Sequence, residues 1–207
     1  KFNMAIISNG TTVADAGAFS ASLGSKVHIK TLTASSSATL SFLNGTDGVV
    51  LDSTYPIYKF EFINIHPATN DTSFTFQVDT GTNTSYNQTI TSTFFNAQHS
   101  EGDANYLMYR TTGDQAQGSS FQRLTEGTGA DNDQSCSGTL TIYNPSDTTF
   151  VKHFIANTHN AHHGDYAMNN FIAGYVNTTT ALTRVQFKMS SGNIDSGKIK
   201  LYGIKDS

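Results

Sequence analysis

The chain has 207 residues, a formal net charge of −4, a single cysteine and only 14% charged residues. Its 12 Lys and Arg residues are scattered, so it lacks the basic stripe with which a nucleic-acid-binding protein neutralises several phosphates. No apolar run approaches the roughly 18 residues of a membrane-spanning helix, and Cys136 has no second cysteine with which to form an intramolecular disulfide. We therefore expect neither nucleic acid nor a membrane as a partner, and a fold without disulfides.

Ten short segments have the composition or the two-residue period of a β-strand. We expect strands at residues 27–32, 38–43, 57–65, 73–79, 89–97, 137–143, 151–158, 171–176, 182–189 and 198–204. Turn-forming pairs such as Asn44-Gly45 and Asn144-Pro145 separate them, and residues 105–109 fit either a short helix or a strand. The pattern predicts an all-β fold, an antiparallel β-sandwich of jelly-roll or related Greek-key type.

The first fifty residues differ from the rest and are expected to form an N-terminal arm with short strands, before a sandwich domain at residues 51–207. In residues 1–24, Ala, Gly and Ser separate small apolar groups. Such an arm can dock on another protein by adding a strand to the edge of its sheet. The alternative is an extended edge strand that completes the domain's own sheet.

The last two segments are the most regular. Val185, Phe187 and Met189 alternate with polar residues, and a second run with Ile199 and Leu201 follows a connector rich in Ser and Gly. This pattern predicts an antiparallel hairpin that closes a sheet. It places Phe187 on the buried face and Lys188 in water.

Residues 178–204 also resemble the C-terminal end of a family of β-rich virion structural proteins from tailed phages of marine bacteria, of the cyanophage and pelagiphage type. Other segments similar to that family are LDSTY at 51–55, YKFEFINIHP at 58–67, TSTFF at 91–95, GDQAQ at 113–117, SGTL at 137–140 and FVKHF at 150–154. The resemblance implies a fibre-like or capsid-decorating component of the particle surface, and it carries no catalytic residues. For a fibre we expect a homotrimer, attached to other virion proteins through the N-terminal arm.

The longest segment without a clear strand, residues 98–135, is the expected binding loop. Its candidate contact residues are Tyr106, Tyr109, Arg110, Phe121 and Arg123. Exposed Tyr and Arg are favoured at interface hot spots, and aromatic rings stack on sugar faces, so the expected ligand is a host surface glycan or protein. The alternative is that the aromatic residues pack back onto the sandwich and hold the loop down.

A group of histidines suggests a metal site at His159, His162, His163 and Asp165. Imidazole and carboxylate ligands suit Zn, Ni or Fe, but three or more must converge in space. On an extended chain the adjacent His162 and His163 point to opposite sides, and no HExxH spacing is present. A solvated His-rich loop is the alternative, and we expect no cofactor.

The sequence offers little for catalysis. It contains no GxSxG nucleophile elbow. A pair of carboxylates for glycoside cleavage could be chosen from Asp103, Asp114, Glu126 and Asp131. Any long loop with several acidic residues allows such a choice, so this is a weak signal for catalysis. We therefore expect a non-enzymatic virion protein on the particle surface, as a tail-fibre or tail-tip subunit or as a capsid decoration, fibre or knob. The alternatives are a free carbohydrate-binding, lectin-like module and a polysaccharide depolymerase.

Overall fold

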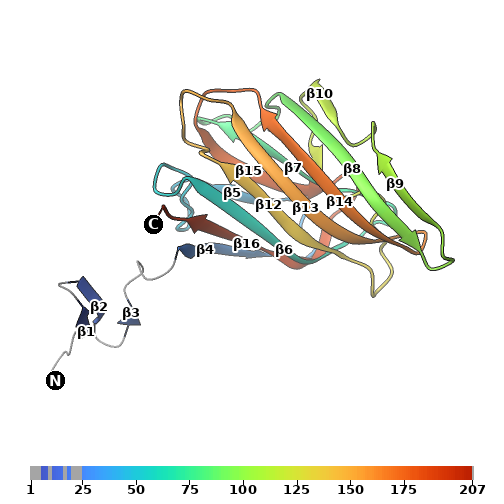
Figure 1. The fold of residues 1–207 in the computed structure, drawn as a ribbon, viewed down its shortest axis with the longest axis horizontal. Helices are drawn as coiled ribbons and strands as arrows, with labels where there is room; N and C mark the ends of the chain where they lie inside the picture. The colour runs from blue at the N-terminus through green and yellow to red at the C-terminus, as the bar shows by residue number, and fades with distance from the viewer. Residues whose placement is uncertain (1–5, 9–10, 16–17, 20–24, 207) are drawn as a thin grey trace.

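The computed structural model describes residues 6–8, 11–15, 18–19 and 25–206, and all regular structure in these residues is β-strand. Two large antiparallel sheets pack face to face as a sandwich (Figure 1). This arrangement confirms the all-β sandwich expected from the sequence. The part of the chain that the structure describes contains no helix that could span a membrane.

The larger sheet has nine strands. Eight of them lie in the order β10 (Gln115–Gly118), β8 (Ile90–Ser100), β14 (Tyr166–Val176), β13 (Lys152–His162), β12 (Cys136–Tyr143), β6 (Ile57–Pro67), β16 (Ile194–Ile204) and β4 (Lys26–Thr33), and β9 (Asn105–Tyr109) also pairs with β8. Neighbours such as β6 and β16, or β8 and β14, are distant in sequence, as in Greek-key sandwiches.

The second sheet has four strands, in the order β11 (Gln122–Arg123), β7 (Phe74–Thr80), β15 (Leu182–Met189) and β5 (Leu40–Leu43). An aromatic core fills the space between the sheets. The ring centroid of Phe187 in β15 lies 5.2 Å from that of Phe60 and 5.4 Å from that of Phe62, both in β6. All three side chains are buried, as the alternation around Phe187 predicted.

A third, small sheet consists of β1 (Ile6–Ser8), β2 (Thr11–Asp15) and β3 (Ala18–Phe19), and within the described residues none of these strands pairs with the sandwich. The other residues of the expected arm, 1–5, 9–10, 16–17 and 20–24, lie outside the described residues. Strands β4 and β5 also belong to the first fifty residues, and they pair with β16 and β15. The sandwich therefore starts at β4, before the boundary that the composition suggested.

All ten expected strands are present, as β4 to β8 and β12 to β16. The prediction of a C-terminal hairpin is wrong. Strand β15 pairs with β5 and β7, whereas β16 pairs with β4 and β6 in the opposite sheet. The apolar faces of β15 and β16 meet across the core instead. The connector crosses between the sheets, where the Ser190 hydroxyl accepts a hydrogen bond from the Ser73 backbone N–H at 2.9 Å.

The expected binding loop, residues 98–135, contains the strands β9, β10 and β11. Residues 105–109 form a strand, β9, and not a helix. Strands β9 and β10 lengthen the outer edge of the larger sheet beside β8, whereas β11 pairs with β7 in the second sheet. The segment is thus divided between the two sheets.

Candidate binding surface

The outer face of the larger sheet carries a row of three aromatic rings on neighbouring strands. Tyr109 of β9 lies opposite Phe95 of β8, and Phe95 lies opposite Phe171 of β14. Directly opposite residues point to the same face of a sheet. The rings of Phe95 and Phe171 stack with centroids 5.0 Å apart and planes 13° apart. Tyr109, Phe95 and Phe171 are called the aromatic row below.

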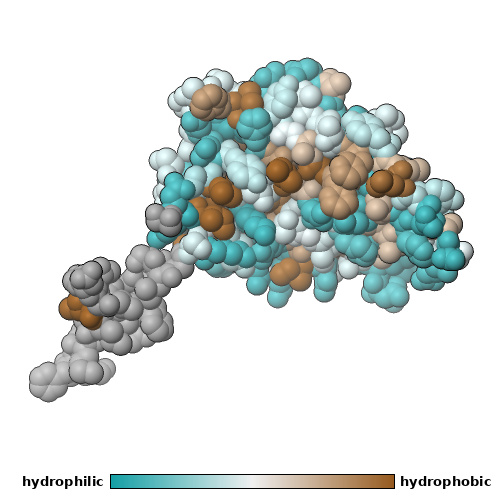
Figure 2. All heavy atoms as spheres, viewed as in Figure 1, coloured by the Kyte–Doolittle hydropathy of each residue, from teal (hydrophilic) through white to brown (hydrophobic). Residues whose placement is uncertain are grey.

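Tyr109 and Phe95 of the aromatic row are exposed to solvent, and Phe171 is partly buried. Phe95 is 42% and Tyr109 is 54% exposed, and Leu107 and Ile155 on the same face are 75% and 53% exposed. Figure 2 shows hydrophobic side chains gathered over this part of the molecule. The outer face of an antiparallel sheet is usually polar, so a face with this many exposed apolar groups indicates contact with another molecule.

The sequence produces this surface with two pairs of adjacent apolar residues. In a strand, successive side chains point to opposite faces. In Phe94-Phe95 and Phe171-Ile172, one residue of each pair therefore points outward while Phe94 and Ile172 enter the core, where they are 0% and 2% exposed. These pairs were the signal in the sequence that the outer face is apolar too.

A second row of rings crosses the same face. Tyr143 in β12, His153 in β13 and Tyr175 in β14 line one cavity, and His153 and Tyr175 are directly opposite each other with ring centroids 6.4 Å apart. Tyr175 is four residues from Phe171 along β14, which corresponds to about 13 Å. The two rows therefore share only β14. From there the aromatic row continues over β8 and β9, and the second row (Tyr143, His153 and Tyr175) continues over β13 and β12.

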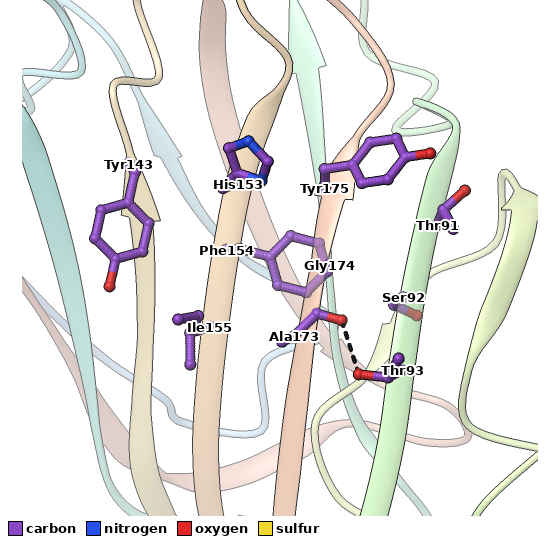
Figure 3. Close-up of a pocket in the computed structure, with 10 residues that line it drawn as sticks. All are labelled: Thr91, Ser92, Thr93, Tyr143, His153, Phe154, Ile155, Ala173, Gly174 and Tyr175. Atoms are coloured by element: carbon purple, nitrogen blue, oxygen red, sulfur yellow. Dashed lines mark hydrogen bonds between the residues drawn. The ribbon is translucent and has the colours of Figure 1, made fainter.

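A trough lies between the two rows. Thr93, Ala173 and Ile155 are directly opposite one another on three adjacent strands and form its floor. The cavity over this floor and beside the second row has a volume of about 510 Å³ (Figure 3). None of its lining residues is Asp, Glu, Lys or Arg. None of the trough residues was a candidate in the sequence, because the rows exist only once the register of five strands is known.

The five residues expected to contact a receptor do not form one site. Tyr109 belongs to the aromatic row, and its hydroxyl donates to the Asp114 carboxylate at 2.7 Å, a contact that raises the pKa of the Tyr109 phenol. Tyr106 is 51% exposed, but it lies three residues earlier on β9 and so points to the other face. Phe121 and Arg123 line a depression of about 390 Å³, which includes Asp114 but not Tyr106, Tyr109 or Arg110.

Two more of these five residues are held by contacts within the protein. The Lys188 ammonium lies 4.1 Å from the centroid of the Phe121 ring, so Phe121 packs back onto the sandwich, as the alternative interpretation held. Arg110 forms an ion pair with Glu126, and their side chains are 24% and 15% exposed. Asn96 approaches the other oxygen of Glu126 at 3.5 Å, and this network is internal.

The residues of the expected metal site separate into two groups. His159, His162 and Asp165 line a polar cavity of about 480 Å³, whereas the Nε2 atom of His163 lies 3.6 Å from the Asp71 carboxylate. In the described part of the chain, no three His, Cys, Asp or Glu side chains lie close enough together to hold a metal ion. The expected metal site is therefore not formed by these four residues.

The adjacent His162 and His163 do not point to opposite sides as expected, because β13 ends at His162 and the chain turns at residues 163–165. Their ring centroids lie 4.2 Å apart with planes 81° apart. Burial, together with the neighbouring His163, lowers the pKa of His162. The Nδ1 atom of His162 accepts a hydrogen bond from the Gly164 backbone N–H at 3.0 Å, so this imidazole holds the turn.

The groups considered for catalysis are buried or have partners within the protein. Burial raises the pKa of the Cys136 thiol, which is 1% exposed. Asp114 accepts the Tyr109 hydroxyl and Glu126 pairs with Arg110. Asp103 lies at the surface, 3.4 Å from His99. Each of these three carboxylates thus has a different partner.

Comparisons with protein-family models, with curated proteins and with solved structures found no match to this chain. The structure itself defines an antiparallel β-sandwich whose larger sheet carries two rows of rings and a trough on its outer face.

Proposed function

We propose that this chain is a non-enzymatic structural protein of a tailed-phage particle, displayed on the particle surface with the outer face of its larger sheet open to contact. The observation that carries this proposal is the exposed aromatic row on a sheet face that is ordinarily polar. Exposed apolar patches with polar surroundings are typical of interaction sites. The resemblance of residues 51–204 to phage virion proteins supports the same class.

In this proposal the N-terminal arm attaches the protein to other virion proteins. An arm with short strands can add to the edge of a partner's sheet, where backbone hydrogen bonds supply the affinity. A homotrimer would present three outer faces at once, so that weak contacts with a host surface glycan or protein reinforce one another. This arrangement serves a tail-fibre or tail-tip subunit and a capsid decoration equally.

The test is immunogold electron microscopy of purified phage particles with antibodies raised against the purified chain. We expect gold particles at regular positions on the tail or on the capsid. Particles without label, in a preparation where the antibodies detect the free chain in the medium, would contradict the proposal and favour a free lectin-like module. Shortening of a host polysaccharide by the purified chain would instead indicate a depolymerase.

A further inference from the structure

The trough between the two rows of rings has the chemistry of a ligand site. Its volume of about 510 Å³ lies within the range of about 300–1,000 Å³ usual for small-ligand sites. Such sites are mostly apolar with a few polar groups that fix orientation. Here the floor offers Ala173 and Ile155, and the rim offers the hydroxyls of Tyr143 and Tyr175.

The polar atoms of the rim are free to meet a ligand. Figure 3 shows one hydrogen bond between the lining residues, from the Thr93 hydroxyl to the Ala173 carbonyl at 3.3 Å. Tyr143, His153 and Tyr175 make none with the other lining residues. Phenol and imidazole groups both donate and accept hydrogen bonds, so they match a ligand with many hydroxyls.

The lining also selects against charge. No Asp, Glu, Lys or Arg lines the trough, so His153 is its only lining side chain that can carry a positive charge, and no cluster of cations is available for an anionic ligand. A neutral ligand with apolar C–H faces and hydroxyl edges fits best, because its faces can pack on the rings while its edges bond to the rim.

The dimensions exclude other occupants. On β14, where both rows contribute a ring, Phe171 and Tyr175 are about 13 Å apart at the backbone, and their side chains fill part of that width. An α-helix with its side chains is about 10–12 Å wide, which is too wide for the remaining space. An extended peptide gains most of its affinity from a free sheet edge, whereas the backbone groups of β13 and β14 under the trough are already paired with each other and with their neighbours.

We propose that the trough binds an unbranched neutral oligosaccharide that lies across β8, β14 and β13, with its sugar rings between the aromatic row and the second row. This inference rests on the proposed display of the outer face on the particle. It differs from the binding loop expected from the sequence, because the site is on the face of the sheet.

The test uses the full chain and isothermal titration calorimetry with maltohexaose, cellohexaose and laminarihexaose as neutral ligands and hexagalacturonate as the acidic one. We expect saturable binding of at least one neutral hexamer at millimolar concentration and none of the acidic one. Ala173→Tyr fills the floor and should abolish binding. Tyr175→Ala removes one ring and should weaken it about tenfold.

The matched control is Ala167→Tyr. Ala167 lies on the same strand and the same face as Ala173, and both are exposed, so this variant makes the same change outside the trough. It should bind like the unchanged chain. Binding that survives Ala173→Tyr, or the absence of binding to every neutral hexamer, would overturn the inference.

The result also separates this inference from the proposed function. A chain found on the particle that binds no neutral hexamer would remove the glycan site and leave the structural role. Sugar binding by a chain that is absent from the particle would remove the structural role and leave the glycan site. If Ala173→Tyr changed the mass measured by light scattering without any sugar effect, the trough would be a contact between copies of this chain, and the inference would fail.

Discussion

The rings of Phe95 and Phe171 stack on the solvent side of the larger sheet, 5.0 Å apart and nearly parallel. Because Phe95 is 42% exposed, this contact contributes little to folding. We expect Phe95→Ala to lower the free energy of unfolding by about 1 kcal/mol. Phe187→Ala, at a fully buried core position, should lower it by about 3–5 kcal/mol.

Urea unfolding followed by circular dichroism measures both changes. A loss for Phe95→Ala as large as that for Phe187→Ala would mean that the outer face is covered by another part of the protein. The aromatic row would then be part of a core and could not be a binding surface.

The Arg110–Glu126 ion pair should matter for stability and not for ligand binding. Removing one partner of a largely buried pair leaves the other charge without compensation, which costs about 3–5 kcal/mol. We expect Arg110→Met to destabilise the protein by up to this amount, and Arg110→Met combined with Glu126→Gln to be more stable than Arg110→Met alone. Chemical denaturation of the single and double variants checks this, and equal stability of the two would argue that Glu126 is solvated.

His162 should make stability dependent on pH. Its pKa is lowered in the folded protein relative to the ordinary value of 6.5, so the unfolded chain takes up a proton more readily as the pH falls. The contribution of His162 is therefore complete above about pH 6.5 and is lost on acidification below it. Urea unfolding at several pH values should show this decrease, and His162→Gln should make it smaller. An unchanged pH profile in His162→Gln would contradict the assignment.

Cys136 should be inert in the folded protein. Burial raises the pKa of its thiol and closes it off from solvent, and the thiolate is the reactive form. We expect no colour with Ellman's reagent under native conditions and one thiol per chain after unfolding in urea. Rapid labelling of the native protein would show that β12 opens or that the thiol is accessible.

The two-residue period in the sequence predicted the strands well and their partners poorly. It placed Phe187 in the core, because alternation decides which face a residue occupies. Alternation does not decide which strand lies alongside, so β15 and β16 were expected as a hairpin although they belong to different sheets. Lys188 was expected in water, and the structure instead places its ammonium over the Phe121 ring.

The candidate site could be anticipated only in part. Tyr109 was identified from its residue type, whereas Phe95 and Phe171 were treated as ordinary strand residues. Their neighbours Phe94 and Ile172 showed that both faces of β8 and β14 are apolar. The stacking itself follows from the register between two strands that are more than sixty residues apart, which no local pattern contains.

We propose that this chain is displayed on a phage particle with the outer face of its larger sheet exposed. Cryo-electron microscopy of the intact particle tests this most directly, because the sandwich can be fitted into density and its orientation read from β8, β13 and β14. We expect symmetric copies on the tail or capsid whose aromatic row and trough face solvent. Particles without such density, or copies whose outer face is buried against the particle, would contradict it.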